Sequence, residues 1–415
     1  MARERFALTD PKDLLLANVA IRIQLSPTNH KLAVDRVETL AAWLDREGSP
    51  LAGKVTLVYA QGSMAIHATI ASALRHDEFD IDAIVPIIVA PGTTAQQALD
   101  LLFETVRGER GTRYYNVTTR NTRCVTVKYR DMHVDLTPAE LIPGRVPRVS
   151  YIFHHRPEEP KTVGKRIVAN PFGFADWFNQ VTPRFHEFEE FFESQSRAMD
   201  AHMAKAAQTE DVPEPIPAYL KPPVVISHQL VKRFRNVQYD KREGRQPPSV
   251  MLAFLMAGFA GTSGRPFAEL LHQARSLRAY FEGHQNRGVL IHVTNPRCPE
   301  DVFSDRWPAT LDEQGLFLKD LKYLVQQLER IEKDAPLDVI ADVFARLFGE
   351  EVSKAVIREF ADTTGRKIDG GALITERGSG RLDLGRSEIA RASAVAAPTI
   401  ITPAARHTFY GPDDE

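Results

Sequence analysis

The chain has 415 residues, 43% of them hydrophobic, and a formal net charge of -2 at pH 7. It is long enough for two sizeable cores, and its near-neutral charge argues against a protein that coats nucleic acid, so no specific nucleic-acid partner is expected. No apolar run is long enough to span a membrane, no apolar signal core follows the first residues, and only Cys124 and Cys298 are present. We therefore expect a cytoplasmic protein without a membrane partner.

The first clear helical pattern follows Ser26 and Pro27. Serine is a common N-cap and proline suits the first helical position, and apolar residues then recur at helical spacing to about residue 45. A short apolar run over 54–60 predicts a strand next. We expect the helix to pack beneath the sheet that contains this strand.

The predicted strand leads into a turn, Gln61, Gly62 and Ser63, after which a second helix is expected. Glycine has no Cβ, so the backbone at Gly62 can approach a phosphate closely. The hydroxyl of Ser63 and the free amides at the start of the helix favour negative charge. These three residues are candidates for nucleotide binding, although a Gly-Ser pair alone is most often only a turn.

A pair of carboxylates, Asp80 and Asp82, follows at an apolar run over 81–88. The run predicts a strand, and side chains two residues apart on a strand project from the same face. One face therefore carries both carboxylates. An isolated Asp-x-Asp at a strand edge is most often simply solvated, so the later residues decide its meaning.

A third carboxylate comes from a predicted hairpin. After an expected helix over 94–106, an apolar run over 123–129 turns into a further run over 132–136. The returning strand of such a hairpin can place Asp135 beside the first two aspartates.

Three carboxylates at one place repel one another unless cations hold them. Magnesium prefers oxygen ligands and commonly shares one or two carboxylates with substrate phosphates. In a two-metal arrangement Asp80 and Asp82 would bridge both ions, and Asp135 would bind the ion that activates an attacking hydroxyl. We therefore expect two Mg²⁺ ions, for which Mn²⁺ can substitute, and ATP or other ribonucleoside triphosphates as substrates. Residues 107–166, with 13 Lys and Arg against 6 Asp and Glu, add positive charge that suits polyphosphates.

The order of turn, helix, Asp-x-Asp strand and third aspartate resembles the polymerase-β-like nucleotidyltransferase superfamily. Within it the chain resembles the CD-NTases, the DncV-like bacterial relatives of cyclic GMP-AMP synthase. Segments 61–69, 79–82 and 134–139 carry this resemblance, and further similar segments begin in the same order at Asn170, His228, Pro247, Asn295 and Arg306. It covers roughly residues 10 to 330.

The resemblance implies a bilobal fold of class α/β plus α, with a polymerase-β-like catalytic lobe, a mostly helical second lobe and a central active-site cleft. We expect the catalytic lobe over 1–170, with the N-terminal helix packed on it. The spine helix and helical nucleotide-binding lobe are expected over 171–362, and a flexible C-terminal tail over 363–415.

The pattern of the second lobe is largely helical. The polar and aromatic stretch 175–207 predicts a long spine helix, and a proline-rich segment then stops it. Apolar helical patterns and one short strand-like run, 288–294, follow, the helical patterns lying at 224–239, 248–260, 265–283 and 314–333.

Lys232 and Ser249 are the candidates for nucleotide binding in this lobe, because the family places a phosphate-contacting lysine and serine in similar segments. At helical spacing Lys232 and Arg235 share a face, and either can neutralise a phosphate. A solvated basic face is an equal alternative for Lys232 and the favoured one for Arg233. Ser249 can instead simply cap the next helix.

Other conspicuous residues have simpler interpretations. His133, His154 and His155 have no cysteine or carboxylate at ligand spacing, so a transition-metal site is not expected. Tyr114 and Tyr115, near the basic hairpin, are candidates for stacking on a base.

The segment 363–415 is rich in Gly, Ala, Ser and Thr and contains 7 of the 24 glycines, so little of it can bury a core. Phe409 and Tyr410 are adjacent in its polar last residues, as in short recognition motifs. We hypothesise a partner-docking peptide. The resemblance implies that the partner of this tail comes from the same operon. It is either a HORMA-type activator or ubiquitin-conjugation-like machinery, and the sequence does not select between them.

The resemblance implies template-independent joining of ribonucleoside triphosphates into a cyclic di- or trinucleotide second messenger, with release of pyrophosphate, in bacterial anti-phage (CBASS) signalling. The alternative is a nucleotidyltransferase that makes linear oligoadenylate or modifies RNA, a protein or a small molecule. A catalytically silent scaffold is disfavoured by the three carboxylates. A double-stranded nucleic-acid sensor would need a long basic surface or a zinc module, which two cysteines cannot make alone.

Overall fold

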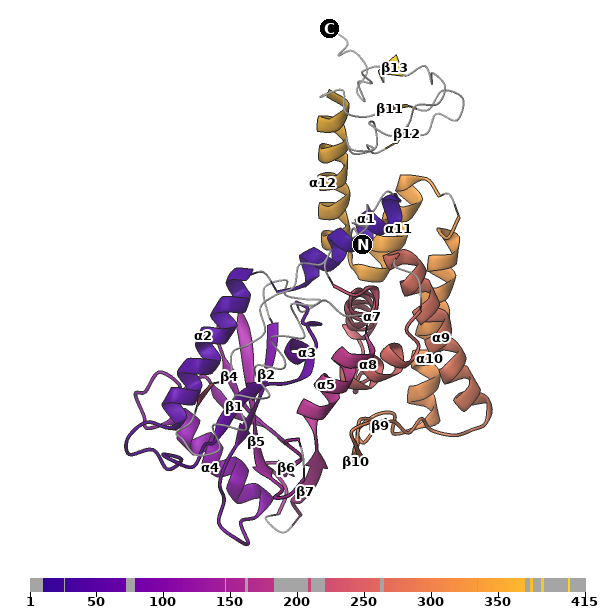
Figure 1. The fold of residues 1–415 in the computed structure, drawn as a ribbon. Coiled ribbons are helices and arrows are strands. Elements are labelled where there is room, and N and C mark those ends of the chain that lie inside the picture. The colour runs from indigo at the N-terminus through magenta and orange to yellow at the C-terminus, as the bar shows by residue number, and fades with distance from the viewer. Residues whose placement is uncertain are drawn as a thin grey trace.

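Two lobes form the part of the chain that the computed structural model describes (Figure 1). That part consists of residues 10–25, 27–71, 79–145, 147–160, 163–182, 208–209, 221–261, 265–333 and 335–369, with three short pieces at 374–375, 382–383 and 402–403. One lobe is built around a mixed sheet and the other is built from helices. A long helix projects beyond the helical lobe.

The sheet lobe has its strands in the order β3-β4-β5-β2-β1-β8, and β6 and β7 continue the sheet from β5. The strands are β1 (Leu57–Ala60), β2 (Phe79–Pro86), β3 (Thr118–Arg120), β4 (Val125–Lys128), β5 (Met132–Leu141), β6 (Ser150–His154), β7 (Lys165–Ala169) and β8 (Gln208–Thr209). At the centre, β2 and β5 are parallel neighbours, whereas β4 and β5 form an antiparallel hairpin. The predicted hairpin is confirmed.

Two helices, α2 (Pro27–Leu44) and α4 (Ala95–Arg107), share one apolar core with the sheet. Alternate strand residues and one stripe of each helix fill it, and Leu40, Leu99 and Val134 are almost completely buried there. A capping box between Thr94 and Gln97 starts α4. The predicted helices over 27–45 and 94–106 are confirmed, as is the packing of the first of them beneath the sheet.

The helical lobe has a separate core. Its elements are α1 (Pro11–Ile23), α5 (Pro171–Val181), α7 (Pro223–Tyr239), α8 (Ser249–Gly258), α9 (Pro266–Asn286), α10 (Leu311–Arg330), α11 (Leu337–Phe348) and α12 (Glu350–Asp369), with a small hairpin of β9 (Thr294–Asn295) and β10 (Cys298–Val302). The helices predicted from the patterns of this lobe correspond to α7, α8, α9 and α10. The short helix α3 (Gly62–Ala65) contacts α5 and α8 and so joins the two lobes.

The first helix lies with the second lobe. Although α1 precedes the sheet lobe in sequence, it packs against α7, α9 and α12, and its apolar residues, such as Leu15 and Val19, belong to the helical core. The domain ranges expected from the sequence remain predictions, and this packing shows that the chain leaves the helical lobe after α1, which ends at Ile23.

The expected spine helix over 175–207 is not continuous. The described helix α5 ends at Val181, and Thr182 is extended with φ -84° and ψ 142°. Pro183 follows, and a residue before proline is sterically disfavoured in the helical region. Residues 183–207 lie outside the described residues.

The expected strand over 288–294 is also wrong. Its residues before Thr294 have no regular structure. Their backbone amides are satisfied by side chains instead of a neighbouring strand: the amide of Ile291 donates to Gln314 Oε1 (2.8 Å) and that of Val293 donates to Ser304 Oγ (2.9 Å). An apolar run can therefore stay irregular while its polar groups are paired.

The helical part of the chain extends further than expected, because α12 continues to Asp369. This helix packs on α1 and α11, and Val352 and Val356 are buried against them. Most of the remaining tail, including the proposed docking peptide, lies outside the described residues. Among the described residues, no helix is both long enough and apolar enough to cross a membrane.

Candidate active site

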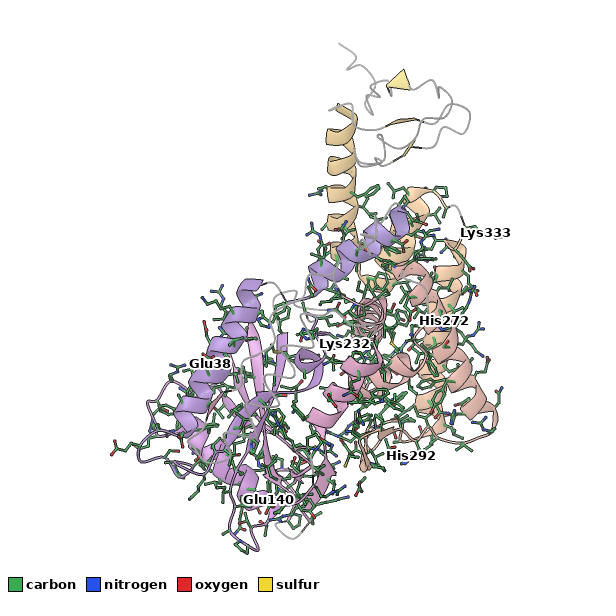
Figure 2. All side chains as sticks on the ribbon, in the orientation of Figure 1. Glu38, Glu140, Lys232, His272, His292 and Lys333 are labelled. Carbon is green, nitrogen blue, oxygen red and sulfur yellow. The ribbon has the colours of Figure 1, made fainter. Side chains whose placement is uncertain are left out.

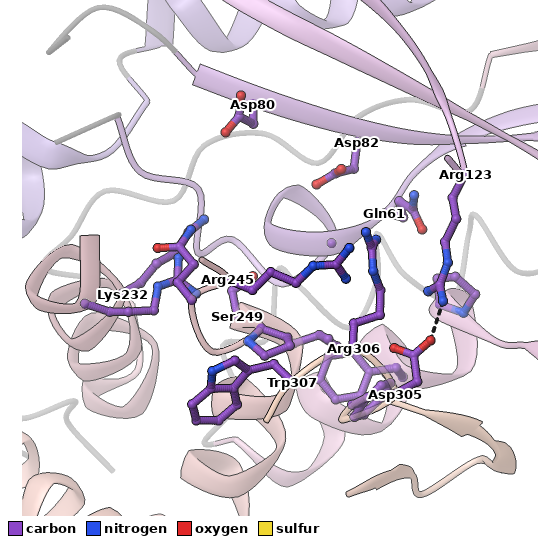
Figure 3. Close-up of a pocket in the computed structure, with 18 of the residues that line it drawn as sticks. Gln61, Asp80, Asp82, Arg123, Lys232, Arg245, Ser249, Asp305, Arg306 and Trp307 are labelled. Atoms are coloured by element: carbon purple, nitrogen blue, oxygen red, sulfur yellow. Dashed lines mark hydrogen bonds and ion pairs between the residues drawn. The ribbon is translucent and has the colours of Figure 1, made fainter. Parts of the chain in front are cut away.

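A cavity of about 870 Å³ lies between the two lobes, near the upper end of the range for small-molecule sites. The sheet lobe contributes the turn before α3, part of β2 and the segment before β4 to its walls. The helical lobe contributes α5, α7, the start of α8 and the segment after β10. Figure 3 shows Asp80 and Asp82 on one wall and Lys232, Ser249 and Arg306 opposite them.

The carboxylates meet because β2 and β5 run side by side in register. Asp80 is opposite His133, and Asp82 is opposite Asp135. The side chain of Asp80 is 83% exposed, whereas Asp82 is half-buried. The hairpin therefore places Asp135 beside Asp82, although only Asp80 and Asp82 line the cavity itself.

Gly62 sits against Asp82. It has φ +60°, and a Cβ at this position would lie 2.7 Å from Asp82 Oδ2. Before it, the backbone amide of Gln61 donates to the carbonyl of Asp82 (2.9 Å), and the Gln61 side chain donates to Thr137 Oγ1 (3.3 Å). The turn is thus fixed to both central strands, and only glycine fits at its tightest point.

The hydroxyl of Ser63 is engaged within the protein. Ser63 is buried and its Oγ lies 3.2 Å from Thr69 Oγ1, and Ser63 does not line the cavity. Gln61 and Gly62 do line it. Of the three turn residues, two are therefore exposed to the cavity and the third supports the turn from behind.

Asp135 is held by a chain of hydrogen bonds. The hydroxyl of Thr126, opposite it on β4, donates to Asp135 Oδ1, and Asn121 Nδ2 donates to Thr126 Oγ1 (2.6 Å). These bonds fix the orientation of the carboxylate. On the other side of the site, His133 Nδ1 lies 3.6 Å from Asp80 Oδ1.

The electrostatics of the carboxylates are unfavourable without a counter-charge. Burial, together with the charges of Asp135 and Asp80, raises the pKa of Asp82 to about 7. Burial also raises the pKa of Asp135, against the hydrogen bond from Thr126, which lowers it. Both shifts arise because negative charges are concentrated in a partly desolvated place.

The donor set fits magnesium shared with a substrate. Within the described chain, no group of three His, Cys, Asp or Glu side chains is gathered closely enough to hold an ion by itself. Magnesium is instead typically bound by one or two carboxylates, waters and substrate phosphates. The space that Gly62 leaves beside Asp82 and the mutual repulsion of the carboxylates suit this kind of ion.

Lys232 lies at the junction of the lobes (Figure 2) and lines the cavity. Burial and the charge of Arg235 lower its pKa to about 8, while Asp82 and Asp80 favour its charged form. Arg235, on the same helical face, also lines the cavity and donates to the carbonyl of Pro247 (2.6 Å). The face of α7 that carries Lys232 and Arg235 is therefore not a solvated basic face.

Arg233 is not solvated either, contrary to the favoured expectation. It is 1% exposed, and its Nε donates to the carbonyl of Phe348 (2.9 Å) at the end of α11. Arg233 is adjacent to Lys232 on α7 and therefore projects in a different direction, into the helical core. There the last carbonyls of α11 need hydrogen-bond donors.

Ser249 is not a helix cap. It is the first residue of α8, the capping position belongs to Pro248, and no side chain caps this helix. Ser249 is half-buried and lines the cavity. The simple capping alternative is therefore wrong, and its hydroxyl lies at the start of a helix whose free amides favour anions.

Three arginines of the cavity were missed as site residues, namely Arg123, Arg245 and Arg306. Each lies outside regular elements, in the segments before β4, between α7 and α8, and after β10. A local excess of positive charge around Arg123 and the family-like segment at Arg306 were the signals available. Nothing in the pattern around Arg245 points to a site.

The tyrosine candidates are wrong. Tyr114 is 2% exposed in the core of the sheet lobe and packs on the edge of Trp43, with ring centroids 5.5 Å apart. Neither Tyr114 nor Tyr115 lines the cavity. Tyr114 is buried and the guanidinium of Arg113 lies over its ring, 4.5 Å from the centroid, so this ring cannot stack on a base.

Comparisons with known proteins agree with this geometry. The family model "Cyclic GMP-AMP synthase DncV-like, nucleotidyltransferase domain" matches residues 57–138. The chain is 35% identical over 366 residues to the cyclic dinucleotide synthase CdnG of Bradyrhizobium diazoefficiens, with 86% of this chain and 85% of that protein covered. The chain belongs to the CD-NTase family.

A solved structure of the Bradyrhizobium diazoefficiens CD-NTase CdnG in complex with GTP has a TM-score of 0.71 at 32% identity, with 86% of this chain and 100% of that chain covered. A c-di-GMP synthase of Roseivirga ehrenbergii is 21% identical over 374 residues, 88% of this chain and 91% of that protein. The E. coli MS115-1 CdnC:HORMA-deltaN complex shares the CD-NTase fold, with a TM-score of 0.51 at 12% identity over 81% of this chain and 96% of that one. This CD-NTase is therefore a nucleotidyltransferase with a bilobal, polymerase-β-like fold.

Proposed function

We propose that this CD-NTase joins ribonucleoside triphosphates, without a template, into a cyclic di- or trinucleotide and releases pyrophosphate. The observation that carries the proposal is the in-register pair of Asp82 and Asp135. Asp82 lies against the Gly62 turn and lines a cavity shared with Lys232 and Ser249. The relatives named cyclic dinucleotide synthase and c-di-GMP synthase support the same reaction.

In this proposal Asp80, Asp82 and Asp135 hold two Mg²⁺ ions. When bound, such ions lower the pKa of an attacking hydroxyl and stabilise the negative charge of the leaving pyrophosphate. Gln61 and Gly62 bring the backbone next to the triphosphate of the donor, and Ser63 supports the turn. Lys232 and Ser249 contact that triphosphate from the helical lobe, where the positive charge of Lys232 favours phosphate oxygens.

Each transfer forms one bond and breaks one. The ribose hydroxyl oxygen of a second nucleotide bonds to the α-phosphorus of the donor, and the bond from that phosphorus to the bridging oxygen breaks. Pyrophosphate leaves with that oxygen, and the hydroxyl proton passes to solvent. A second transfer within the linear intermediate closes the ring, while the two lobes exclude water that would hydrolyse the triphosphate.

Product analysis tests the proposal. Purified protein is incubated with the four ribonucleoside triphosphates and Mg²⁺ or Mn²⁺, treated with phosphatase, and the surviving products are identified by mass spectrometry. Cyclic masses that resist phosphatase are expected and name the bases. Linear products alone would favour the alternative, a transferase that makes oligoadenylate or modifies RNA, a protein or a small molecule.

We further propose that the product serves anti-phage (CBASS) signalling and that the last residues of the chain dock a HORMA-type or ubiquitin-conjugation-like partner. The hypothesis of a docking peptide depends on Phe409 and Tyr410 in a polar context. Deletion of residues 396–415 should abolish binding of the operon partner and protection against phage, while basal pyrophosphate release stays unchanged. Unchanged partner binding after the deletion would refute the docking role.

A further inference from the structure

Residues 67–69, which we call the support segment, fold back onto the turn that opens α3. The backbone amide of Ala68 donates to the carbonyl of Ser63 (2.8 Å). The hydroxyl of Thr69 lies 3.2 Å from the hydroxyl of Ser63. Both the backbone and the side chain of Ser63 are therefore held by this segment, and the position of the segment fixes the position of the turn.

Two side chains from α7 and the residues just before it hold the support segment. Gln229 on α7 donates from Nε2 to the carbonyl of Thr69 (3.2 Å). Lys221 donates from Nζ to the carbonyl of His67 (3.0 Å). The same Nζ donates to Gln24 Oε1 (2.6 Å), in the connection between α1 and α2. The segment behind the turn is thus tied to the helical lobe at two points.

Both donors are buried. Gln229 is 0% exposed and Lys221 is 7% exposed, so a carbonyl that loses either donor is left without solvent to replace it. Burial lowers the pKa of Lys221 to about 7. Because a neutral side chain would avoid the desolvation of this ammonium group, the lysine indicates a role other than stability.

The helix that holds the support segment also reaches the cavity. Lys232 follows Gln229 by three residues on α7, so the two side chains are neighbours on the helix surface. Lys232 lines the cavity opposite Asp80 and Asp82 (Figure 3). A shift of α7 relative to the sheet lobe therefore moves Lys232 in the cavity and the support segment behind the turn together.

We propose that Gln229 and Lys221 are positioning residues, which fix Gly62 and Ser63 relative to Lys232 through the support segment. The inference rests on the proposed function, in which this turn meets the triphosphate of the donor. Neither Gln229 nor Lys221 lines the cavity, so each acts through the support segment and not by contact with substrate. The turn is correctly placed for transfer only while α7 holds the segment behind it.

Hydrogen–deuterium exchange tests the support of the turn without turnover. In the full chain, the amides of residues 61–70 should exchange about tenfold faster in Gln229→Met and in Lys221→Met than in the wild type, because the support segment loses a donor. Gln273→Met is the matched control. Gln273 is also 0% exposed, but its Nε2 donates to the carbonyl of Met256 (2.9 Å) and so joins α9 to α8. Unchanged exchange over 61–70 in the first two variants, or an equal increase in the control, would overturn the inference.

Pyrophosphate release then distinguishes positioning from a purely structural role. At a temperature at which every variant is folded, Gln229→Met should lower kcat about tenfold, whereas Gln273→Met should leave it unchanged. Thr69→Val removes the contact with the Ser63 hydroxyl and should lower kcat by a similar factor. The double variant of Gln229 and Thr69 should lose less than the product of the two single losses, because both act through one chain of contacts.

A kcat of the wild type in Gln229→Met, or single losses that multiply in the double variant, would contradict the inference. Absence of pyrophosphate release by the wild type would instead count against the proposed function. The exchange experiment would still decide whether Gln229 and Lys221 hold the turn.

Discussion

Gly62 has a backbone conformation that favours glycine, and it lies directly against the carboxylate of Asp82. Its φ of +60° is rare for residues with a side chain, and the missing Cβ leaves the space beside Asp82 Oδ2. Gly53 has a similar φ of +67° but no atom within 4 Å of an added Cβ. A substitution at Gly53 therefore introduces backbone strain alone, whereas one at Gly62 also crowds Asp82.

We predict that Gly62→Ala and Gly53→Ala each lower the free energy of unfolding by about 1 kcal/mol, since both place a Cβ in the left-handed region. Only Gly62→Ala should also lower the rate of pyrophosphate release, by roughly 100-fold, because its Cβ displaces Asp82. Denaturant unfolding and a pyrophosphate assay on both variants measure the two effects. Similar rates for the two variants would contradict the assigned role of the turn.

His228 on α7 gives a prediction about pH. It is 1% exposed, and neither ring nitrogen has a hydrogen-bond partner in the described part of the structure. Burial, with the charges of Lys232 and Arg235, lowers its pKa to about 3. The folded protein therefore keeps this histidine neutral where the unfolded chain, with a pKa near 6.5, takes up a proton.

The contribution of His228 to stability is thus complete above about pH 6.5 and is lost as the pH falls toward 3. We predict that the free energy of unfolding falls by up to about 1.4 kcal/mol per pH unit from this group below pH 6.5. In His228→Gln this part of the slope should disappear. Urea unfolding of both proteins at pH 7.5 and 5.5 measures it, and identical pH dependence would exclude His228 as the source.

At the scale of elements, the junction between the lobes depends on a few buried polar groups. Asn295 in β9 donates from Nδ2 to the carbonyl of Asn170 (2.8 Å) and to Asp301 Oδ2 (2.9 Å). The same Asp301 oxygen accepts from the backbone amide of Asn170 (3.0 Å). Asn170, which follows β7 of the sheet lobe directly, is thereby tied to the β9–β10 hairpin of the helical lobe.

We predict that Asn295→Ala lowers the free energy of unfolding by about 1–3 kcal/mol, because it removes two buried hydrogen bonds. It should also raise the KM for nucleotide, since Asp301 lines the cavity. Asn286→Ala is the control, because Asn286 is exposed at the end of α9. Equal stability of the two variants would show that the junction does not depend on this network.

Elements with a strong local pattern could be predicted from the sequence, and those decided by distant contacts could not. The alternation around Asp80 and Asp82 and the turn before Met132 predicted β2, β5 and their side-by-side carboxylates. Pro183 in the sequence could have predicted the end of α5. The helical composition of residues 175–207 instead favoured one long helix. The packing of α1 on α7, α9 and α12 has no local signal, because its apolar stripe fits either core.

The same distinction holds for the site. Asp82 and Asp135 were predictable because strand periodicity fixes their direction. The burial of Arg233 and Tyr114 depends on which neighbour each meets in the folded chain. Arg123, Arg245 and Arg306 come from three loops, and loop residues have no periodicity from which a direction can be inferred.

At the scale of the whole molecule, the cavity exists only where the lobes meet. Asp80 and Asp82 come from the sheet lobe, and Lys232 and Ser249 come from the helical lobe. Substrate binding should therefore stabilise both lobes together. The position of Asp80 and Asp82 opposite Lys232 suits a metal-bound triphosphate between them.

The most direct test of this account compares pyrophosphate release by the wild type and by the double variant Asp80→Asn with Asp82→Asn. The control is Asp338→Asn, since Asp338 is exposed on α11. We predict that the double variant releases no pyrophosphate, while its melting temperature in EDTA equals or exceeds that of the wild type because the repulsion that raises the pKa of Asp82 is removed. Release by the double variant at the rate of the wild type would contradict the assignment of this cavity as the active site.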